Sequence, residues 1–253
     1  MPYVIYEKKE HIAYITLNRP ERLNALGTEL SQQLREAETR FAEDDGAWVA
    51  IYTGAGDRAF CAGRDLKEAA EQGSRGERTV LSQRRLSIEL NKPTIAAVNG
   101  VAYGGGFERA LGCDIRICSE NATFALAEVK VGLCPPTASF ILPRLVGLSN
   151  AMWLLLSGEP IDAQEAHRIG LVTKVVPLPE LMPAATRIAE VICENAPLAI
   201  RATKQLAELG MEVPLDYARR LGLALINSVW GSEDAVEGAR AFAEKRKPVW
   251  RMR

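Results

Sequence analysis

Short apolar runs separated by polar turns characterise the first half of the chain. Two alternating segments, Val4–Glu7 and His11–Leu17, predict a pair of strands joined by a polar turn. Apolar residues at helical spacing follow Thr28, which predicts a helix there. Strands and helices should therefore alternate in this half. Continuous apolar runs predict further strands at Trp48–Thr53, Thr94–Val98 and Ile115–Cys118.

The pattern changes at Thr137, after which helical spacing dominates and only Thr173–Val176 reads as extended. We therefore predict an α/β core over residues 1–195 and a helical region over residues 196–253. In the core, Glu68–Arg78 is polar and predicts a loop, and Val80–Leu90 predicts a helix. The later helices are expected at Ser139–Leu145, Asn150–Leu156, Ala163–Ile169, Leu178–Glu194, Leu198–Leu209, Pro214–Asn227 and Ser232–Lys245.

Composition narrows the class of protein. The chain has 253 residues and a net charge of −1, which gives no overall field for nucleic acid or an anionic membrane. Five cysteines, an odd number without a Cys-x-x-Cys pair, indicate reduced thiols rather than a disulfide framework or zinc site. No leader-like or spanning apolar segment is visible, so we expect a cytoplasmic protein. The basic end Lys245–Arg253 reads most simply as a solvated terminus, with phosphate contact as the alternative.

Two glycine-containing turns carry the candidate chemistry. Phe60–Leu66 follows a predicted strand, and Asn99–Glu108, which contains three consecutive glycines, follows another and opens a helix. Amides at a helix start lack intrahelical partners and lie at the positive end of the dipole, so they suit a phosphate or a developing oxyanion. The alternative is a close-packed turn in which no side chain fits. Neither a dinucleotide fingerprint nor a Walker lysine is present.

Two glutamates stand in or beside apolar segments. Glu108 falls in the first turn of the helix after the glycines, where it could simply complement the helix dipole. Glu128 lies in the apolar stretch Thr123–Gly132, where it could be a solvated strand-end carboxylate. If the two met in apolar surroundings, they would suit paired acid/base work, since a shared site separates their pKa values.

These motifs resemble those of the enoyl-CoA hydratase/isomerase (crotonase) family. Phe60–Glu68 resembles its first signature, and Asn99–Glu108 with Cys113–Arg116 resembles its second. The resemblance runs nearly end to end and in order. It also includes the segments Leu17–Pro20 with Asn24–Leu26, Leu142–Gly147, Ser157–Glu159 with Ala163–Ala166, Gly170–Val172 and Val175–Pro177.

The resemblance implies a fold and a substrate. The fold would be an α/β spiral of ββα units followed by a C-terminal helical region that forms trimers, often paired into hexamers. The substrate would be an acyl-CoA thioester, with no metal or redox cofactor beyond the coenzyme A of the substrate. The implied reaction is reversible hydration of a 2-enoyl-CoA. Alternatives are double-bond isomerisation, dehydration of a functionalised acyl-CoA, and a non-catalytic acyl-CoA- or RNA-binding role.

The resemblance also implies roles for particular residues. The backbone amides of Arg64 and Gly105 would form an oxyanion hole, and Glu108 and Glu128 would hold and activate water. Six further residues would line coenzyme A: Leu23, Ala25, Ala62, Asp65, Leu66 and Gly104. Phe242 and Lys245 would contact it from the C-terminal helix, either of the same chain or of a neighbouring subunit.

Two residues depart from the family pattern. Pro136 stands where the family often has small residues, and it cannot donate a backbone hydrogen bond. Arg109 replaces the apolar residue that usually follows the helix glutamate. Both changes are expected to line or flank the acyl end of the site, so they leave the acyl chain undefined.

Overall fold

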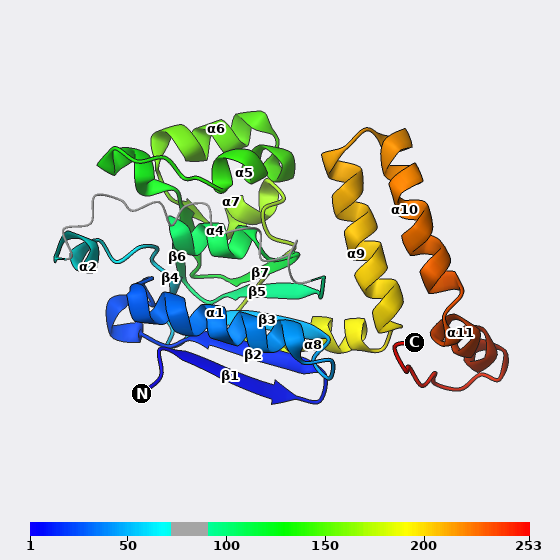
Figure 1. Cartoon of the computed structure of the whole chain (residues 1–253). Coiled ribbons are helices and arrows are strands. Elements are labelled where there is room, and N and C mark those ends of the chain that lie inside the picture. Colours follow the sequence, from blue (N-terminus) through cyan, green and yellow to red (C-terminus); the bar gives the residue numbers. More distant parts are fainter. Residues whose placement is uncertain (72–90) are drawn as a thin grey trace.

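The computed structural model describes residues 1–71 and 91–253 and shows a mixed α/β core with a helical C-terminal region (Figure 1). The larger sheet has six strands in the order β1-β2-β3-β5-β7-β10. The β1–β2 pair is antiparallel, and every later neighbour in this sheet is parallel. The strands are Val4–Lys9, Ile12–Leu17, Val49–Gly54, Thr94–Val98, Ile115–Ser119 and Lys174–Val176.

A smaller sheet has the order β4-β6-β8-β9 and its first three strands are parallel. Its strands are only two or three residues long: Ala59–Cys61, Val101–Tyr103, Thr123–Ala125 and Ile161–Asp162. The sequence did not predict them, because alternation needs four or more residues to be read. Strand β6 lies inside the segment expected to be a glycine turn.

Alternating residues of the buried strands feed two cores on opposite faces of the large sheet. On β3, Ala50 and Tyr52 belong to one apolar cluster, whereas Val49 and Ile51 belong to the other. Helix α1 (Thr28–Glu43) covers the first face with Leu30, Leu34, Ala37 and Phe41. Helix α8 (Leu178–Cys193) covers the second with Leu181, Ala185 and Ala189.

The remaining helices follow the predicted order, with one correction. Residues 68–71, expected to be part of a loop, belong to helix α2 (Leu66–Glu71). The rest of that expected loop and the whole of the predicted Val80–Leu90 helix lie outside the described residues. The other elements are η1 (Pro20–Arg22), α4 (Gly105–Leu111), η3 (Ala127–Val131), α5 (Ala138–Val146), α6 (Leu148–Ser157), α7 (Ala163–Arg168), α9 (Pro197–Glu212), α10 (Leu215–Trp230) and α11 (Glu233–Ala243).

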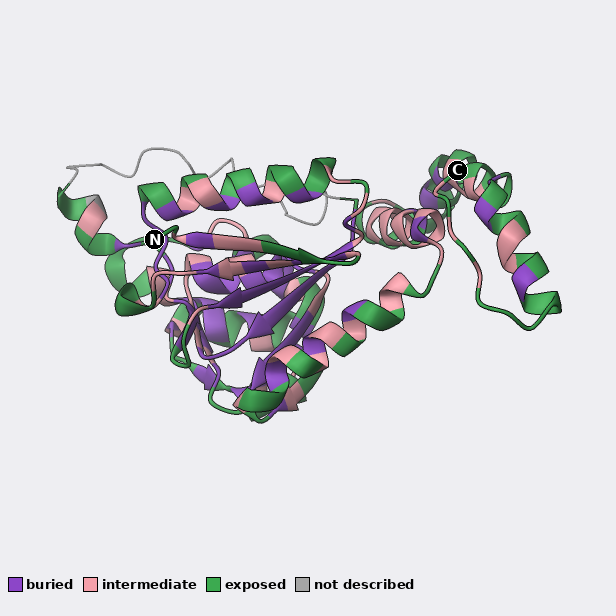
Figure 2. Ribbon diagram, turned by 90° about the horizontal axis from the view of Figure 1, so that it is seen from below, coloured by how far each residue is buried: buried purple, intermediate pink, exposed green. Residues whose placement is uncertain are grey.

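Helices α9, α10 and α11 extend away from the sheets, and both views show them at one side of the core (Figures 1 and 2). Buried residues concentrate in the core, whereas exposed and intermediate ones predominate on these helices (Figure 2). One anchor is Lys204 of α9, which donates to Asp114 Oδ2 and to the Lys92 carbonyl, both at 2.9 Å. The helical region is thus tied to the end of the large sheet.

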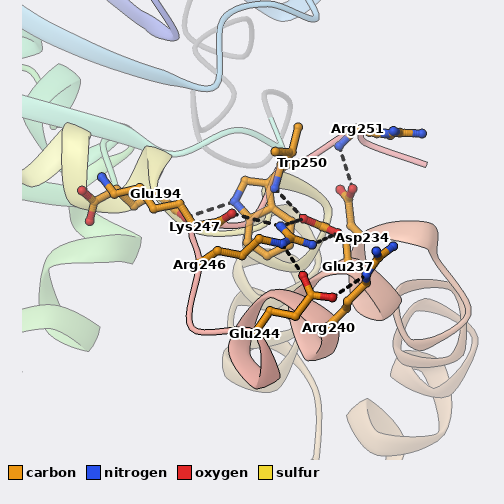
Figure 3. Close-up of polar contacts among 10 residues, drawn as sticks. Glu194, Asp234, Glu237, Arg240, Glu244, Arg246, Lys247, Trp250 and Arg251 are labelled. Carbon is orange, nitrogen blue, oxygen red and sulfur yellow. Dashed lines mark hydrogen bonds and ion pairs between the residues drawn. The ribbon is translucent and has the colours of Figure 1, made fainter.

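The basic C-terminal end is not a loose solvated tail. Asp234, which is 2 % exposed, accepts hydrogen bonds from the Arg251 and Met252 amides at 2.7 and 3.0 Å (Figure 3). Arg246 forms a bidentate ion pair with Glu237 at 2.6 and 2.9 Å. The Trp250 indole donates to the Glu194 carbonyl at 3.0 Å. The tail therefore closes the helical region back onto the end of α8.

Within the described part of the chain, no helix combines the length and the apolar character that crossing a membrane requires.

Candidate active site

The first glycine-containing turn follows strand β4 and pairs with the segment before α1. Leu26 and Arg64 form a parallel β-bridge, in which the Leu26 amide donates to the Gly63 carbonyl at 2.7 Å. The Asp65 amide donates in turn to the Leu26 carbonyl at 3.1 Å. Since this bridge uses the groups on either side of Arg64, the amide of Arg64 points away from Leu26.

The second turn leads from β6 into α4 through Gly104, whose φ of +50° favours glycine. Strand β6 continues as far as the Gly104 amide, which donates to the Ala125 carbonyl at 2.9 Å. Gly105 is then the first residue of α4, so its amide has no acceptor within the helix. The turn presents this amide at the positive end of the helix dipole.

The two turns touch backbone to backbone. A Cβ atom on Gly106 would lie 2.0 Å from the Cys61 carbonyl oxygen. One on Gly63 would lie 3.2 Å from the Gly105 nitrogen, and one on Gly105 would lie 4.0 Å from the Arg64 nitrogen. The glycines therefore allow the two turns to pack closely, and this packing brings the amides of Arg64 and Gly105 side by side.

Glu108 is buried at 6 % exposure within α4. Its Oε1 accepts hydrogen bonds from the amides of Thr137 and Ala138, at 2.7 and 2.8 Å, where α5 begins. Burial raises the pKa of Glu108 and outweighs these two hydrogen bonds, which lower it. Burial therefore decides the direction in which the pKa of Glu108 shifts.

Glu128 lies in η3 and is not a solvated strand end. Its Oε2 is buried and has no hydrogen-bond partner among the described residues. Burial raises the pKa of Glu128, and the charge of Glu108 raises it further. A Cβ on Gly104 would lie 3.0 Å from Glu128 Oε1, so this carboxylate sits against the glycine turn. The two glutamates therefore share one electrostatic environment beside the paired amides.

The residues expected to line coenzyme A mostly surround the first turn. The Ala62 amide donates to the Leu23 carbonyl at 3.0 Å, which joins these two segments. Leu66 opens α2 and is 52 % exposed, whereas Ala25 and Asp65 are buried at 8 and 9 %. The Asp65 carboxylate forms an ion pair with Arg19, in which Oδ2 lies 2.9 Å from Arg19 Nη1. Asp65 therefore supports the turn from inside.

Phe242 and Lys245 lie elsewhere. Phe242 belongs to the last turn of α11 and Lys245 follows directly after that helix, at the side of the molecule opposite α2 (Figure 1). Phe242 is 87 % exposed. Within one chain the structure does not bring these two residues to the glycine turns or the glutamates.

The structure shows where Arg109, one of the two departures from the family pattern, points. Arg109 points from α4 to α1, where its Nη1 contacts Glu38 Oε1 at 2.6 Å. Adjacent helical residues point in directions about 100° apart, so the Arg109 side chain points away from Glu108 and into a contact with α1. Pro136 immediately precedes Thr137, and the amides after it, not its own missing one, hold Glu108.

The sequence reasoning missed Asn24, which fixes the loop before α1. Asn24 is fully buried, and its Nδ2 donates to the Ala59 carbonyl at 2.8 Å while its Oδ1 accepts from the Arg19 amide at 2.9 Å. Leu23 and Asn24 have φ values of 51° and 54°, a left-handed conformation that these contacts hold in place. An asparagine shortly after the Asn18-Arg19-Pro20 break was the available signal, because asparagine tolerates the left-handed conformation and bonds to nearby backbone groups.

The charged side chains of the site do not form a metal-binding group. Over residues 1–71 and 91–253, no three His, Cys, Asp or Glu side chains cluster so that they could hold a metal ion. The described residues place two neighbouring backbone amides, those of Arg64 and Gly105, near two carboxyl groups with raised pKa values, Glu108 and Glu128.

Comparison with known proteins identifies the family. Residues 7–253 match the model of the enoyl-CoA hydratase/isomerase family. The chain is 42% identical over 256 residues to the (E)-benzylidenesuccinyl-CoA hydratase of Thauera aromatica, covering 98% of both chains. It is 41% identical over 251 residues to the carnitinyl-CoA dehydratase of Citrobacter koseri, covering 96% of this chain and 95% of that one.

Solved structures agree. A crystal structure of an enoyl-CoA hydratase from Bacillus anthracis superposes with a TM-score of 0.94 at 37% identity, covering 99% of this chain and 100% of that one. An enoyl-CoA hydratase from Mycobacterium tuberculosis H37Rv gives a TM-score of 0.91 at 38% identity, with full coverage of both chains. The protein belongs to the enoyl-CoA hydratase/isomerase family, and the predicted crotonase-type fold is confirmed.

Proposed function

We propose that this protein is an acyl-CoA hydro-lyase that reversibly adds water to a 2-enoyl-CoA to give a 3-hydroxyacyl-CoA. The observation that carries the proposal is a pair of carboxyl groups with raised pKa values next to the paired amides of Arg64 and Gly105: Glu128 lies against Gly104, and Glu108 lies in the helix that Gly105 opens. The geometry supports two functions at once: stabilisation of a thioester oxyanion and proton transfer next to it.

The amides of Arg64 and Gly105 would form the oxyanion hole. The thioester carbonyl gains negative charge when the double bond is attacked or when the α proton leaves. Two fixed backbone donors stabilise that charge without reorganisation, and one such donor contributes about 3–4 kcal/mol to the transition state. The arginine side chain takes no part in this role.

The two glutamates would handle the water. The oxygen of water adds to the β carbon, one proton of water passes to a carboxylate, and a proton from the carboxyl pair goes to the α carbon. Oε1 of Glu108 accepts hydrogen bonds from two amides, so Oε2 is the oxygen available for this exchange. The pair exchanges protons as a unit, and neither half-step is assigned to a single residue.

The names of the relatives support water chemistry. One is a hydratase and the other a dehydratase, so both act by gain or loss of water on an acyl-CoA. The two names describe different acyl groups, a benzylidenesuccinyl and a carnitinyl group. A functionalised acyl chain, hydrated or dehydrated, is therefore included in the proposal.

Double-bond isomerisation is the second candidate function. It would use the same enolate, and the family description includes isomerases. An isomerase needs one carboxylate to move a proton between carbons, whereas this site contains two that share one environment. The second carboxylate favours hydration. A non-catalytic acyl-CoA- or RNA-binding role leaves the buried carboxyl pair without a purpose.

We further propose that the chain works as a homotrimer or a homohexamer. The helical region and α5–α6 expose large apolar side chains, which a soluble monomer rarely leaves uncovered. In such an assembly, Phe242 and Lys245 would reach coenzyme A bound to a neighbouring subunit, and no cofactor besides the substrate's coenzyme A is proposed. The most exposed apolar residues include Phe140, Trp153, Leu156, Trp230, Val236 and Phe242.

Activity against a panel of thioesters tests the proposed function. The protein is incubated with a series of 2-enoyl-CoA, 3-enoyl-CoA and 3-hydroxyacyl-CoA substrates, and the products are weighed by mass spectrometry. Hydration or dehydration appears as the gain or loss of one water. Conversion of a 3-enoyl-CoA to a 2-enoyl-CoA, with no water exchanged on any substrate, would instead establish isomerisation.

A further inference from the structure

Arg19 is a half-buried cation that connects the two segments forming the first turn. Its side chain is 14 % exposed, and Nη1 donates to Asp65 Oδ2 at 2.9 Å. The same nitrogen lies 3.7 Å from Glu68 Oε2, and the Tyr3 ring lies 5.5 Å from the guanidinium. A cation thus enclosed by two carboxylates and an aromatic ring is fixed in place.

Asp65 joins this cation to the peptide that bears the candidate oxyanion-hole amide. Its Oδ1 accepts from the amides of Lys67 and Glu68, both at 3.2 Å, so it caps α2. The Glu68 amide lowers the pKa of Asp65 most, and Arg19 lowers it further, so the carboxylate stays ionised. Asp65 directly follows Arg64, and its own amide donates to Leu26. Its side chain therefore helps set the plane of the neighbouring peptide.

Glu68 completes the connection to α1. Its Oε1 accepts from the Thr28 amide at 2.8 Å, at the first residue of that helix. A Cβ on Gly27 would lie 2.2 Å from Glu68 Oε2, so a larger residue there would displace this carboxylate. Arg19 thus contacts one carboxylate that caps α2 and one that caps α1.

We propose that Arg19 is a positioning residue that holds the Arg64 amide in the direction of the reacting thioester oxygen. It acts through Asp65 and Glu68, which clamp the Leu26–Arg64 bridge from both ends, and it touches no substrate. The inference rests on the proposed function, because it assigns a support to the oxyanion hole of that reaction. A displacement of about 1 Å at such a donor costs about a hundredfold in rate.

The test compares three variants of the full-length protein. Arg19→Met removes the cation, Arg19→Lys keeps the charge without the planar fork, and Arg58→Met is the matched control. Arg58 is exposed and donates to the carbonyl of Pro20, the residue after Arg19, at 3.2 Å. For each, kcat and KM are measured on the preferred 2-enoyl-CoA, together with the absorbance of an enolised 3-ketoacyl-CoA bound to the protein.

We expect Arg19→Met to lower kcat by about ten- to a hundredfold, with KM changed less than about threefold and the bound enolate signal reduced. Arg19→Lys should fall between wild type and Arg19→Met, and Arg58→Met should match wild type. A purely structural role would lower the melting temperature and the amount of active protein without a weaker enolate signal per bound ligand. That result would overturn the proposal.

A double-variant cycle tests whether Arg19 acts through Asp65. If Arg19 acts through Asp65, the variant combining Arg19→Met with Asp65→Asn loses little more activity than the worse single variant. Independent, additive losses would contradict that route. Should Arg19→Met fail to fold, Arg19→Lys decides: wild-type kcat and enolate signal would overturn the proposal, and a reduction of both would support it.

The outcomes also distinguish failure of the positioning role of Arg19 from failure of the proposed hydration function. Wild-type protein that neither exchanges water with any thioester nor binds a 3-ketoacyl-CoA as its enolate would overturn both. Active wild type with an unaffected Arg19→Met variant would overturn the positioning role alone.

Discussion

The carboxylate of Glu108 accepts a hydrogen bond of 2.7 Å from the amide of Thr137, at the start of helix α5. The same oxygen accepts from the next amide, that of Ala138, at 2.8 Å. One oxygen of a buried carboxylate is therefore fixed, and the side chain has a single orientation. The dipole of α5 and these amides partly offset the cost of burying its charge.

Replacement of either glutamate by glutamine should remove most of the hydration activity. Glu108→Gln and Glu128→Gln keep the shape of the side chain but cannot take up or release a proton at neutral pH. General acid–base catalysis contributes about 10²- to 10⁴-fold, so we expect kcat to fall by that factor. The measurement is steady-state hydration of crotonyl-CoA, or of the best substrate in the thioester panel.

The control for this pair is Glu120→Gln, at an exposed glutamate on the surface of the core. It should leave kcat within about twofold of wild type, since isolated surface changes have small effects. Full hydration by both active-site variants would show that the carboxyl pair is not the acid/base machinery.

The raised pKa of Glu128 makes a prediction about stability and pH. A carboxyl group whose pKa is raised by folding binds protons more tightly in the native state. Its protonated form is the more stable one, so stability falls as pH rises from about 4.3, the ordinary value for glutamate, through the raised value. Glu128→Gln should therefore melt at a higher temperature than wild type at pH 7.

This advantage should shrink as the pH is lowered and vanish below about pH 4, where Glu128 is protonated in both states. Thermal melts of wild type and Glu128→Gln across pH 3.5 to 8 check the sign. A variant that melts below wild type at pH 7 would show that the unpartnered Glu128 oxygen is not destabilising.

The long strands and the helices of the second half were predictable from the sequence because each contains several turns or alternations of apolar residues. The short strands β4, β6, β8 and β9 were not, since they are stabilised by pairing between segments far apart in the chain. The glycine turns were visible as candidates. Their contact with each other depended on a backbone approach that only the folded structure reveals.

The same limit applies to the site. Glu108 and Glu128 were recognisable as charges in or beside apolar segments, but their shared environment depends on where η3 and α5 pack. Arg19 lies in the segment Leu17–Pro20, to which the sequence alone gave no function, because its partners Asp65 and Glu68 lie in a different segment. The direction of Arg109 likewise depended on the position of Glu38 on α1.

Gly106 should tolerate no side chain. An added methyl group would lie 2.0 Å from the Cys61 carbonyl oxygen, a backbone atom that cannot rotate away. We expect Gly106→Ala to lower the free energy of unfolding by about 1–3 kcal/mol or more and to separate the two turns. Chemical denaturation and kcat should therefore both be affected.

The matched control is Gly210→Ala in helix α9, where nothing described lies within 4 Å of the new methyl group. Alanine is favoured over glycine in a helix by up to about 1 kcal/mol, so this variant should be equally or more stable. Equal effects of the two substitutions would contradict the close contact between the turns.

Both carboxylate oxygens of Asp234 hold the C-terminal tail, each by a hydrogen bond from a backbone amide (Figure 3). Asp234→Asn replaces one acceptor with an NH₂ group that faces a backbone N–H, which costs about 1–3 kcal/mol. We expect faster hydrogen exchange at the amides of Arg251 and Met252 and earlier proteolytic loss of the tail. Asp216→Asn, at an exposed aspartate of α10, is the control and should leave both unchanged.

The most direct test of the central claim follows the oxygen of water. Wild-type protein is incubated with its best 2-enoyl-CoA in water enriched in ¹⁸O, and the product is weighed and fragmented by mass spectrometry. We predict a 3-hydroxyacyl-CoA that carries ¹⁸O on its β carbon, with formation greatly slowed by Glu108→Gln and by Glu128→Gln. A product without ¹⁸O, or one formed equally fast by both variants, would contradict hydration by this carboxyl pair.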